Sequence, residues 1–169
     1  MKYIFQDFKK NWEAKNWKGI IFMISFRLTS LIRANRFAML FFFVIPILHV
    51  LLFNWLMGFD IPLKTIIGKD FVIFHGHGVV INAKTKIGRN VTIRQHTTIG
   101  TIDMVENEGS LAPEIGDNVQ IGAHVIILGP IEIGHNSIIG AGTLVLKSVP
   151  SGFKVFGNPI TLKPINPRF

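Results

Sequence analysis

The chain has 169 residues, with 18 Lys plus Arg against 10 Asp plus Glu, 49% hydrophobic residues and no cysteine. Its length suits a single domain. A charged fraction of only 17% excludes a disordered chain, because an apolar, weakly charged sequence can bury enough surface to offset the entropy of ordering. The lack of cysteine excludes a disulfide scaffold, a thiolate zinc site and a cysteine nucleophile.

Positive charge gathers at the two ends of the chain. Residues 1–36 hold eight Lys/Arg and two Asp/Glu, whereas residues 37–132 hold six Lys/Arg and eight Asp/Glu. Residues 133–169 hold four Lys/Arg and no Asp/Glu. The sequence pI near 10.1 raises the question of nucleic acid, but no dense Lys/Arg run with interleaved aromatic residues accompanies it. We therefore expect no nucleic-acid partner and other roles for the basic ends.

Residues 1–59 form a basic, apolar and aromatic region that contains all three Trp, and we expect it to be helical. Residues 37–59 carry no charge, and a bilayer span needs about 20 apolar residues. Three interpretations stay open: a single span, a hairpin that lies in a membrane surface through residues 18–59, and a helical cap buried in an oligomer. Pro46 favours a kinked or broken helix over a straight span.

Residues 60–169 show a period of six. The hexapeptides IGDNVQ at 115–120 and IGAHVI at 121–126 follow one another directly. Aliphatic residues recur in this register at Ile81, Ile87, Ile93, Ile99, Ile115, Ile121, Ile127, Ile133, Ile139 and Val145. A period of six is neither helical nor a strand alternation; it predicts a short strand and a turn in each repeat, so that three repeats make one triangular coil of a parallel β-solenoid.

The segment IFHGHGVVIN at 73–82 and the hexapeptides around it resemble the hexapeptide-repeat acyltransferases over about residues 61–160. Within that family they are similar to the serine O-acetyltransferases, and most of all to the colanic-acid and capsular-polysaccharide O-acetyltransferase type. The resemblance implies a left-handed parallel β-helix, a homotrimer and acetyl-CoA as the acyl donor.

The period breaks twice, at a two-residue surplus around 75–77 and at the polar loop 101–114. Solenoids place function at such breaks, because inserted residues leave the stacked core. By resemblance, His75 falls on the catalytic histidine of the serine acetyltransferases, and Asp60 falls on the acid that orients it. Histidine suits the base of an acetyl transfer, which has to exchange a proton near neutral pH. Because 15 residues are a little under one coil, we expect Asp60 beside His75.

We assign His77, His96 and Asn82 to the acceptor side of this site, and regard His124 and His135 as solvated corner residues. Serine acetyltransferases carry an Arg-His pair after their loop that helps to hold the amino acid, whereas residues 111–115 here read LAPEI. This departure favours a neutral sugar hydroxyl over free serine.

Coenzyme A needs a groove with close access to the backbone and cations for its phosphates. By resemblance, small residues along that groove are Gly100, Gly122, Ala123, Gly140 and Ala141. Candidate phosphate ligands are Lys147, Lys154 and Lys163. No His or carboxylate cluster has metal-ligand spacing, so we expect no metal.

The expected activity is acetyl-CoA-dependent O-acetylation of a sugar of a bacterial surface polysaccharide, or of its lipid-linked precursor, at the cytoplasmic face of the cell membrane. A single span that keeps the basic residues 1–36 inside would carry the catalytic coil away from cytoplasmic acetyl-CoA, so the hairpin and the cap are favoured. The alternatives are a serine O-acetyltransferase of cysteine biosynthesis and a non-catalytic solenoid scaffold.

Overall fold

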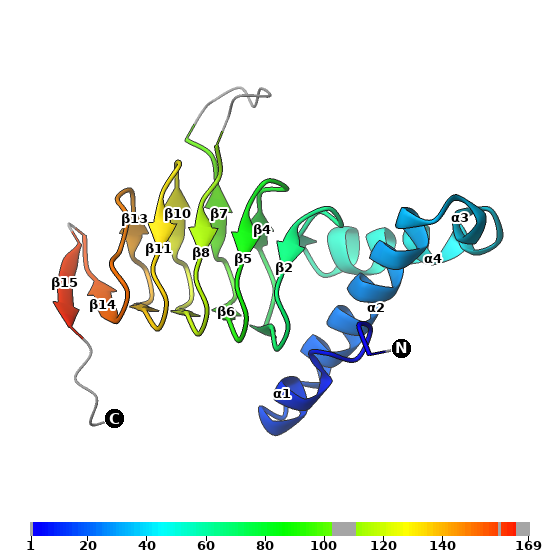
Figure 1. The fold of residues 1–169 in the computed structure, drawn as a ribbon, viewed down its shortest axis with the longest axis horizontal. Helices are drawn as coiled ribbons and strands as arrows, with labels where there is room; N and C mark the ends of the chain where they lie inside the picture. The colour runs from blue at the N-terminus through cyan, green and yellow to red at the C-terminus, as the bar shows by residue number, and fades with distance from the viewer. Residues whose placement is uncertain (1, 103–110, 159, 165–169) are drawn as a thin grey trace.

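A computed structural model describes residues 2–102, 111–158 and 160–164. Helices gather at one end of the molecule, and a row of short strands extends from them (Figure 1). The helical elements are α1 (Phe8–Glu13), α2 (Trp17–Ala34), α3 (Arg36–Phe42), α4 (Val44–His49) and the π-helix η1 (Val50–Leu56).

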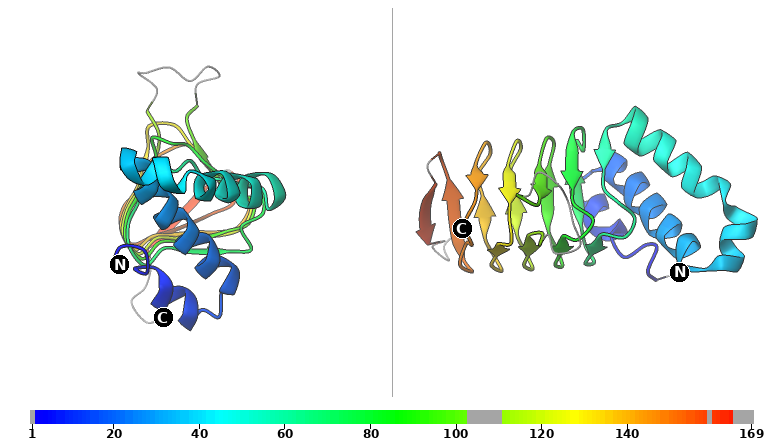
Figure 2. Two further views of the ribbon diagram at one scale, coloured as in Figure 1. Left: turned by 90° about the vertical axis from the view of Figure 1, so that its right-hand side faces the viewer. Right: turned by 90° about the horizontal axis from the view of Figure 1, so that it is seen from above.

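The strands form three sheets that run along the faces of the predicted left-handed parallel β-helix, which is confirmed. Seen along its axis, the coil encloses a roughly triangular section (Figure 2). One sheet, called sheet A here, contains β1 (Phe59–Asp60), β4 (Val79–Ile81), β7 (Thr98–Gly100), β10 (Ile126–Leu128) and β13 (Leu144–Val145). Sheet B contains β2 (Ile66–Ile67), β5 (Lys86–Ile87), β8 (Glu114–Ile115) and β11 (Glu132–Ile133). Sheet C contains β3 (Val72–Phe74), β6 (Thr92–Arg94), β9 (Gln120–Ile121), β12 (Ile138–Ile139), β14 (Phe153–Phe156) and the antiparallel β15 (Thr161–Pro164).

The register between coils locates both breaks of the period. Ile115 pairs with Ile133, an ordinary coil of 18 residues, whereas Ile73 pairs with Ile93 twenty residues on. Ile87 pairs with Ile115, twenty-eight residues on, so the loop adds ten. The loop predicted at residues 101–114 ends one residue earlier than expected, because Glu114 already belongs to β8.

The interior of the coil is a stack of aliphatic side chains from successive repeats. The six-residue positions from Ile81 to Val145 are at most 4% exposed. Burial of these side chains stabilises the folded chain by about 25 cal/mol per Å² of apolar surface. Each layer also packs on its copy in the next coil. The repeat therefore supplies the core as well as the turns.

The corner between sheets B and C is built from residues in left-handed backbone conformation. Asn90, Asn118 and Asn136 have φ between 54° and 59°, which Asn tolerates better than most residues. Their side chains form a ladder, with Nδ2 to Oδ1 distances of 2.8 Å and 3.0 Å. Beside them the Arg89 guanidinium hydrogen-bonds to Asp117 and holds the pKa of that carboxyl below its usual value.

Helices α1 and α2 cover the first coil and satisfy its open edge. Arg27 and Asp7 form a buried ion pair with an Nε–Oδ2 distance of 2.9 Å, and each side chain is 2% exposed. The Arg27 guanidinium also donates to the carbonyls of Ile67 and Gly68, while Asp7 Oδ1 accepts from the backbone N–H of Phe71. Unpaired strand edges are costly when buried, so these side chains replace the missing neighbouring coil.

Two asparagines extend this arrangement along the same edge. Asn11 Nδ2 donates to the carbonyl of Phe71 at 2.8 Å, and Asn16 Nδ2 donates to that of Ile73 at 2.8 Å. Phe22 stacks on Phe59 with ring centroids 4.6 Å apart, which joins the helical and coil cores. The expected boundary at residue 60 therefore cuts β1 and divides one continuous core.

Helices α3, α4 and η1 project beyond the end of the coil (Figure 2). The axis bends by 70° between residues 36–42 and 44–56, at Phe43. The broken helix expected from Pro46 is present, and this proline occupies the first turn of α4, where its missing N–H costs nothing. Among the described residues no single helix is both long and apolar enough to cross a membrane, whereas the bent pair meets that test when counted together.

We predict that Arg27→Met lowers the free energy of unfolding by about 3–5 kcal/mol, because the Asp7 carboxylate would remain buried without its partner. Urea denaturation followed by circular dichroism measures the change. The control Lys9→Met removes an exposed contact with Glu13 at 3.9 Å and should cost less than about 0.5 kcal/mol. Equal stability of the two variants would contradict the capping role.

Candidate functional site

The corner between sheets C and A brings most of the predicted site residues into one row. In successive coils its two turn positions are occupied by His77 and Gly78, by Gln95 and His96, by Ala123 and His124, and by Ala141 and Gly142. Each second residue donates its backbone N–H to the first residue of the coil before, at 2.8–3.0 Å. We call this row the His corner.

The two-residue surplus lies at His75 and Gly76, at the first coil of the His corner. His75 is exposed and has φ 58°, so its backbone occupies the left-handed region. A Cβ on Gly76 would lie 1.9 Å from the Phe59 ring, so glycine is required for the close approach of this corner to β1. The two extra residues thus leave the His75 side chain on the surface, while Gly76 packs inward.

Two further imidazole rings stack on one another in the coils that follow the His75 turn. The rings of His96 and His124 lie 4.6 Å apart and 20° from parallel. A Cβ on Gly78, which has φ +64°, would lie 2.5 Å from His96 Nδ1. His96 therefore follows directly after the coil of His77, as expected, and its ring occupies the space that glycine leaves open.

Asp60 lies on the neighbouring strand but does not touch His75. It is exposed on β1, which pairs with β4 through Asp60 and Val80, while the turn of His75 leads into β4. Among the described residues, no hydrogen bond or ion pair joins the Asp60 carboxylate to the His75 imidazole. The expected contact that orients His75 stays a prediction.

Two predicted residues lie at a different corner, between sheets A and B. Asn82 Oδ1 accepts from the backbone N–H of Lys84 at 2.8 Å, and Asn82 N donates to the carbonyl of Ile99. Gly100 ends β7 at the base of the loop, and a Cβ there would make ordinary contact with Leu128 at 3.8 Å. Residues 103–110 of the predicted loop lie outside the described residues.

The small residues predicted for coenzyme A continue the His corner. Gly122 and Ala123 stack on Gly140 and Ala141 one coil later, and a Cβ on Gly122 would lie 2.6 Å from the backbone nitrogen of Ala141. The backbones of successive coils are therefore tightly stacked at this corner. These residues are partly or fully exposed, so the backbone is accessible. A ligand lying along this corner would pass from the small residues to the histidines.

The three predicted phosphate ligands do not lie together. Lys154 on β14 is directly opposite Lys163 on β15, whose Nζ lies 5.4 Å from the centre of the Phe156 ring. Like charges opposite one another destabilise a strand pair, so an anion bound between them would relieve repulsion. Lys147 is exposed at the corner between sheets A and B, apart from this pair. Within the described ranges, no three His, Asp or Glu side chains form a metal site.

Sequence reasoning missed two members of the His corner. His124 is exposed at a turn, as the sequence predicts, and its ring also stacks on His96, which the sequence analysis does not anticipate. Gln95 follows His77 in the corner, and the buried Oε1 of Gln95 has no hydrogen-bond partner among the residues that the structure describes. The 28-residue spacing from His96 to His124 is one coil plus the ten surplus residues of the loop, and this spacing was the available signal.

The arrangement suits proton transfer next to a bound thioester. Exposed imidazoles supply candidate bases, and the adjacent tight turns leave room for an extended ligand to approach the backbone. The described part of the chain offers no comparable row of bases at the other two corners.

Comparison with known proteins agrees with this description. Residues 112–147 match the family model "Bacterial transferase hexapeptide (six repeats)". The chain is 39% identical over 122 residues to "Putative colanic acid biosynthesis acetyltransferase WcaB" of Escherichia coli K12, covering 70% of this chain and 72% of that protein. It is 44% identical over 105 residues to "Serine acetyltransferase 4" of Arabidopsis thaliana, covering 62% of this chain but 29% of the plant protein.

Solved structures extend the similarity to the helical region. The soybean serine acetyltransferase apoenzyme superimposes with a TM-score of 0.75 at 31% identity, covering 96% of this chain and 68% of the soybean chain. A structure described as "Serine Acetyltransferase- Complex with CoA" has a TM-score of 0.74 at 25% identity, with the same coverage of 96% and 68%. The similarity therefore includes the helices as well as the coil.

We predict that Gly78→Ala displaces the His96 ring and destabilises the chain more than Gly152→Ala does. Both glycines have positive φ, at +64° and +78°, and alanine in this conformation costs about 1–3 kcal/mol at either position. An added Cβ meets the His96 ring at position 78 and nothing within 4 Å at position 152. Histidine NMR signals and urea denaturation test the difference, and unchanged His96 signals in Gly78→Ala would contradict the packing.

Proposed function

The chain belongs to the hexapeptide-repeat acetyltransferases, and from that premise we propose that it transfers an acetyl group from acetyl-CoA to a sugar hydroxyl of a bacterial surface polysaccharide or its lipid-linked precursor. The observation that carries the proposal is the His corner. There the surplus turn of His75 shares one edge with the small residues 122–123 and 140–141.

The proposed reaction is a direct transfer. The His75 imidazole accepts the proton of the acceptor hydroxyl while the oxygen attacks the thioester carbon. Collapse of the tetrahedral intermediate breaks the carbon–sulfur bond, and the protonated imidazole returns the proton to the CoA thiolate. The ester and free CoA are the products, so atoms and charge balance. Asp60, on the adjacent strand, would steady the protonated ring.

A sugar is the favoured acceptor for two reasons. The segment LAPEI at 111–115 lacks the Arg-His pair expected for an amino-acid carboxylate. The E. coli relative named for colanic acid biosynthesis is covered over 72% of its length, against 29% for the plant serine acetyltransferase. Serine is the second candidate, because serine acetyltransferases of Staphylococcus aureus are 46% identical over 102 residues.

The donor is proposed to lie along the His corner, with its phosphates near Lys154 and Lys163. Support comes from the similar solved structure with CoA and from the facing lysines, whose repulsion a bound anion would relieve. A homotrimer is the proposed assembly. The apolar region 18–59 would hold it at the cytoplasmic face of the cell membrane, where acetyl-CoA and a lipid-linked acceptor meet.

We predict that His75→Asn lowers kcat by about 10²–10⁴, because general base catalysis typically contributes that factor. The control His135→Asn changes a histidine at another corner and keeps an acceptor for the Asp117 N–H, so it should retain activity. Thioester cleavage is measured with acetylated and unacetylated glycan acceptors and with serine. Activity of His75→Asn within twofold of the unmodified chain would exclude this base.

The same acceptor series distinguishes the alternatives. Faster turnover of serine than of any glycan would assign the chain to serine acetylation. Absence of CoA binding by calorimetry, together with absence of turnover, would favour a non-catalytic scaffold.

We predict that Lys154→Gln/Lys163→Gln raises the KM for acetyl-CoA about tenfold, equivalent to roughly 1.4 kcal/mol, with little change in kcat. The reason is that phosphate contacts act equally on the ground state and the transition state. Acetyl-pantetheine, which lacks the nucleotide phosphates, should show the same KM with both proteins. The control Lys2→Gln/Lys69→Gln removes the same charge elsewhere, and an equal rise in KM there would contradict a local phosphate site.

A further inference from the structure

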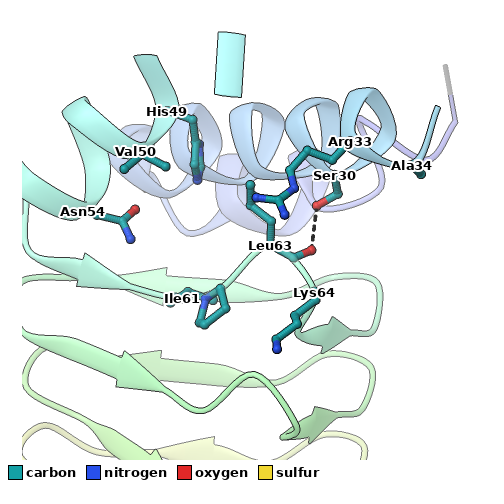
Figure 3. A pocket seen from close by; sticks show the side chains of 10 residues that line it. Ser30, Arg33, Ala34, His49, Val50, Asn54, Ile61, Leu63 and Lys64 are labelled. Carbon is teal, nitrogen blue, oxygen red and sulfur yellow. Dashed lines mark hydrogen bonds between the residues drawn. The ribbon is translucent and has the colours of Figure 1, made fainter. Parts of the chain in front are cut away.

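A cavity of about 480 Å³ lies between the helices and the first coil, away from the His corner. The C-terminal turn of α2 forms one wall, α4 and η1 form another, and the turn at residues 61–64 forms the floor (Figure 3). Ser30 closes one side through its hydroxyl, which donates to the carbonyls of Phe26 at 2.8 Å and Leu63 at 3.3 Å. The volume of the cavity is in the range of small-molecule sites.

The charge of this cavity is positive. Arg33 and Lys64 both line it; in Figure 3 the Arg33 side chain lies below α2, whereas the Lys64 side chain starts at the turn and points away from the helices. Neither forms an ion pair with any residue that the structure describes, and none of the lining residues is acidic. Two cations that line one cavity without an acidic neighbour in its lining favour an anion, and phosphate is an anion that Arg and Lys bind well.

A buried histidine adds a hydrogen-bonding group without a partner. His49 is 3% exposed, and its Nδ1 lies 2.8 Å from Ser25 Oγ. Its Nε2 is buried and has no hydrogen-bond partner in the described ranges. Burial lowers the pKa of His49 to about 4, so the ring is neutral at pH 7. When Ser25 donates to Nδ1, the ring proton is on Nε2, and leaving that donor unpaired costs about 1–3 kcal/mol. The ring points toward the first coil among the cavity residues (Figure 3).

An apolar groove adjoins the cationic cavity. It has a volume of about 540 Å³ and is lined by Leu31, Phe42 and Ile45, among others. Ala34 lines both hollows, so the two meet at the C-terminal turn of α2. A cationic cavity that continues into an apolar groove is complementary to an amphiphile with an anionic head and a hydrocarbon chain.

The surface around both hollows is strongly apolar. Phe37 is 80% exposed, Leu40 71%, Phe41 75% and Trp55 82%. Large exposed apolar patches mark interaction sites, and aromatic side chains next to cations are typical of surfaces that lie in a membrane interface. The amphiphile that such a surface meets is a membrane lipid.

We propose that the cavity formed by Arg33, Lys64 and His49 binds the phosphate of an anionic phospholipid, whose hydrocarbon chain lies in the adjoining groove. The site deepens the membrane contact in the proposed function and does not depend on acetyl transfer. Arg33 and Lys64 neutralise the phosphate, and His49 lines the inner side of the cavity. The hairpin α3–η1 then lies in the same lipid surface, with the coil extending away from it.

The test is co-sedimentation of the full chain with phosphatidylcholine vesicles that contain 30% phosphatidylglycerol. We expect Arg33→Gln/Lys64→Gln to bind at least tenfold more weakly than the unmodified chain, with an unchanged melting temperature because both side chains are exposed. The matched control Lys10→Gln/Lys18→Gln removes the same charge from exposed sites outside the cavity and should lose less than threefold.

Each other outcome overturns the proposal in an identifiable way. Equal losses in both double variants would mean that general positive charge drives binding, and no loss in either would leave the apolar hairpin as the sole contact. Full competition by millimolar inorganic phosphate would mark a site for a soluble phosphate. A shift in oligomeric state of Arg33→Gln/Lys64→Gln would assign the cavity to a subunit interface. Acetyl transfer to a soluble acceptor, measured in parallel, reports separately on the proposed function.

Discussion

The buried contact between Arg27 and Asp7 is the constraint on which the rest of the structure depends. A parallel β-helix begins with an open coil edge, whose backbone groups would be costly to bury unpaired. Arg27 donates to the carbonyls of Ile67 and Gly68, and Asp7 accepts from Phe71, so the helices take the place of a preceding coil. The helical region is thus part of the coil's fold, and its position relative to the first coil is determined by hydrogen bonds.

That arrangement separates two chemically different surfaces. The coil presents the His corner, where turns in the left-handed conformation hold exposed imidazoles next to closely stacked backbone. Helices α3, α4 and η1 lie at the opposite end of the molecule from β15 (Figure 1), and the cationic cavity lies between the helices and the turn at residues 61–64. The proposed acetylation of a lipid-linked sugar would use both surfaces, because its donor is dissolved in water and its acceptor is held in a membrane.

The basic N-terminal region illustrates why total charge is a poor guide to a binding surface. Eight cations lie within residues 1–36, and Arg27 is neutralised in the interior by Asp7. Arg33, six residues later on the same helix, forms no ion pair with any described residue and lines a cavity together with Lys64. Composition counts these two arginines alike, whereas burial and geometry give one a structural role and the other an electrostatic one.

Periodicity in the sequence was sufficient to predict the coil, its stacked core and the surplus turn at His75, because these features repeat over six residues and depend on near neighbours. The broken helix near Pro46 was predicted for the same local reason. Contacts in three dimensions were needed to place His124 on His96, to put Asn82 and Lys147 at another corner, and to bury Arg27. These features depend on register across a ten-residue insertion and on hydrogen bonds between residues up to 64 positions apart, which a local pattern does not encode.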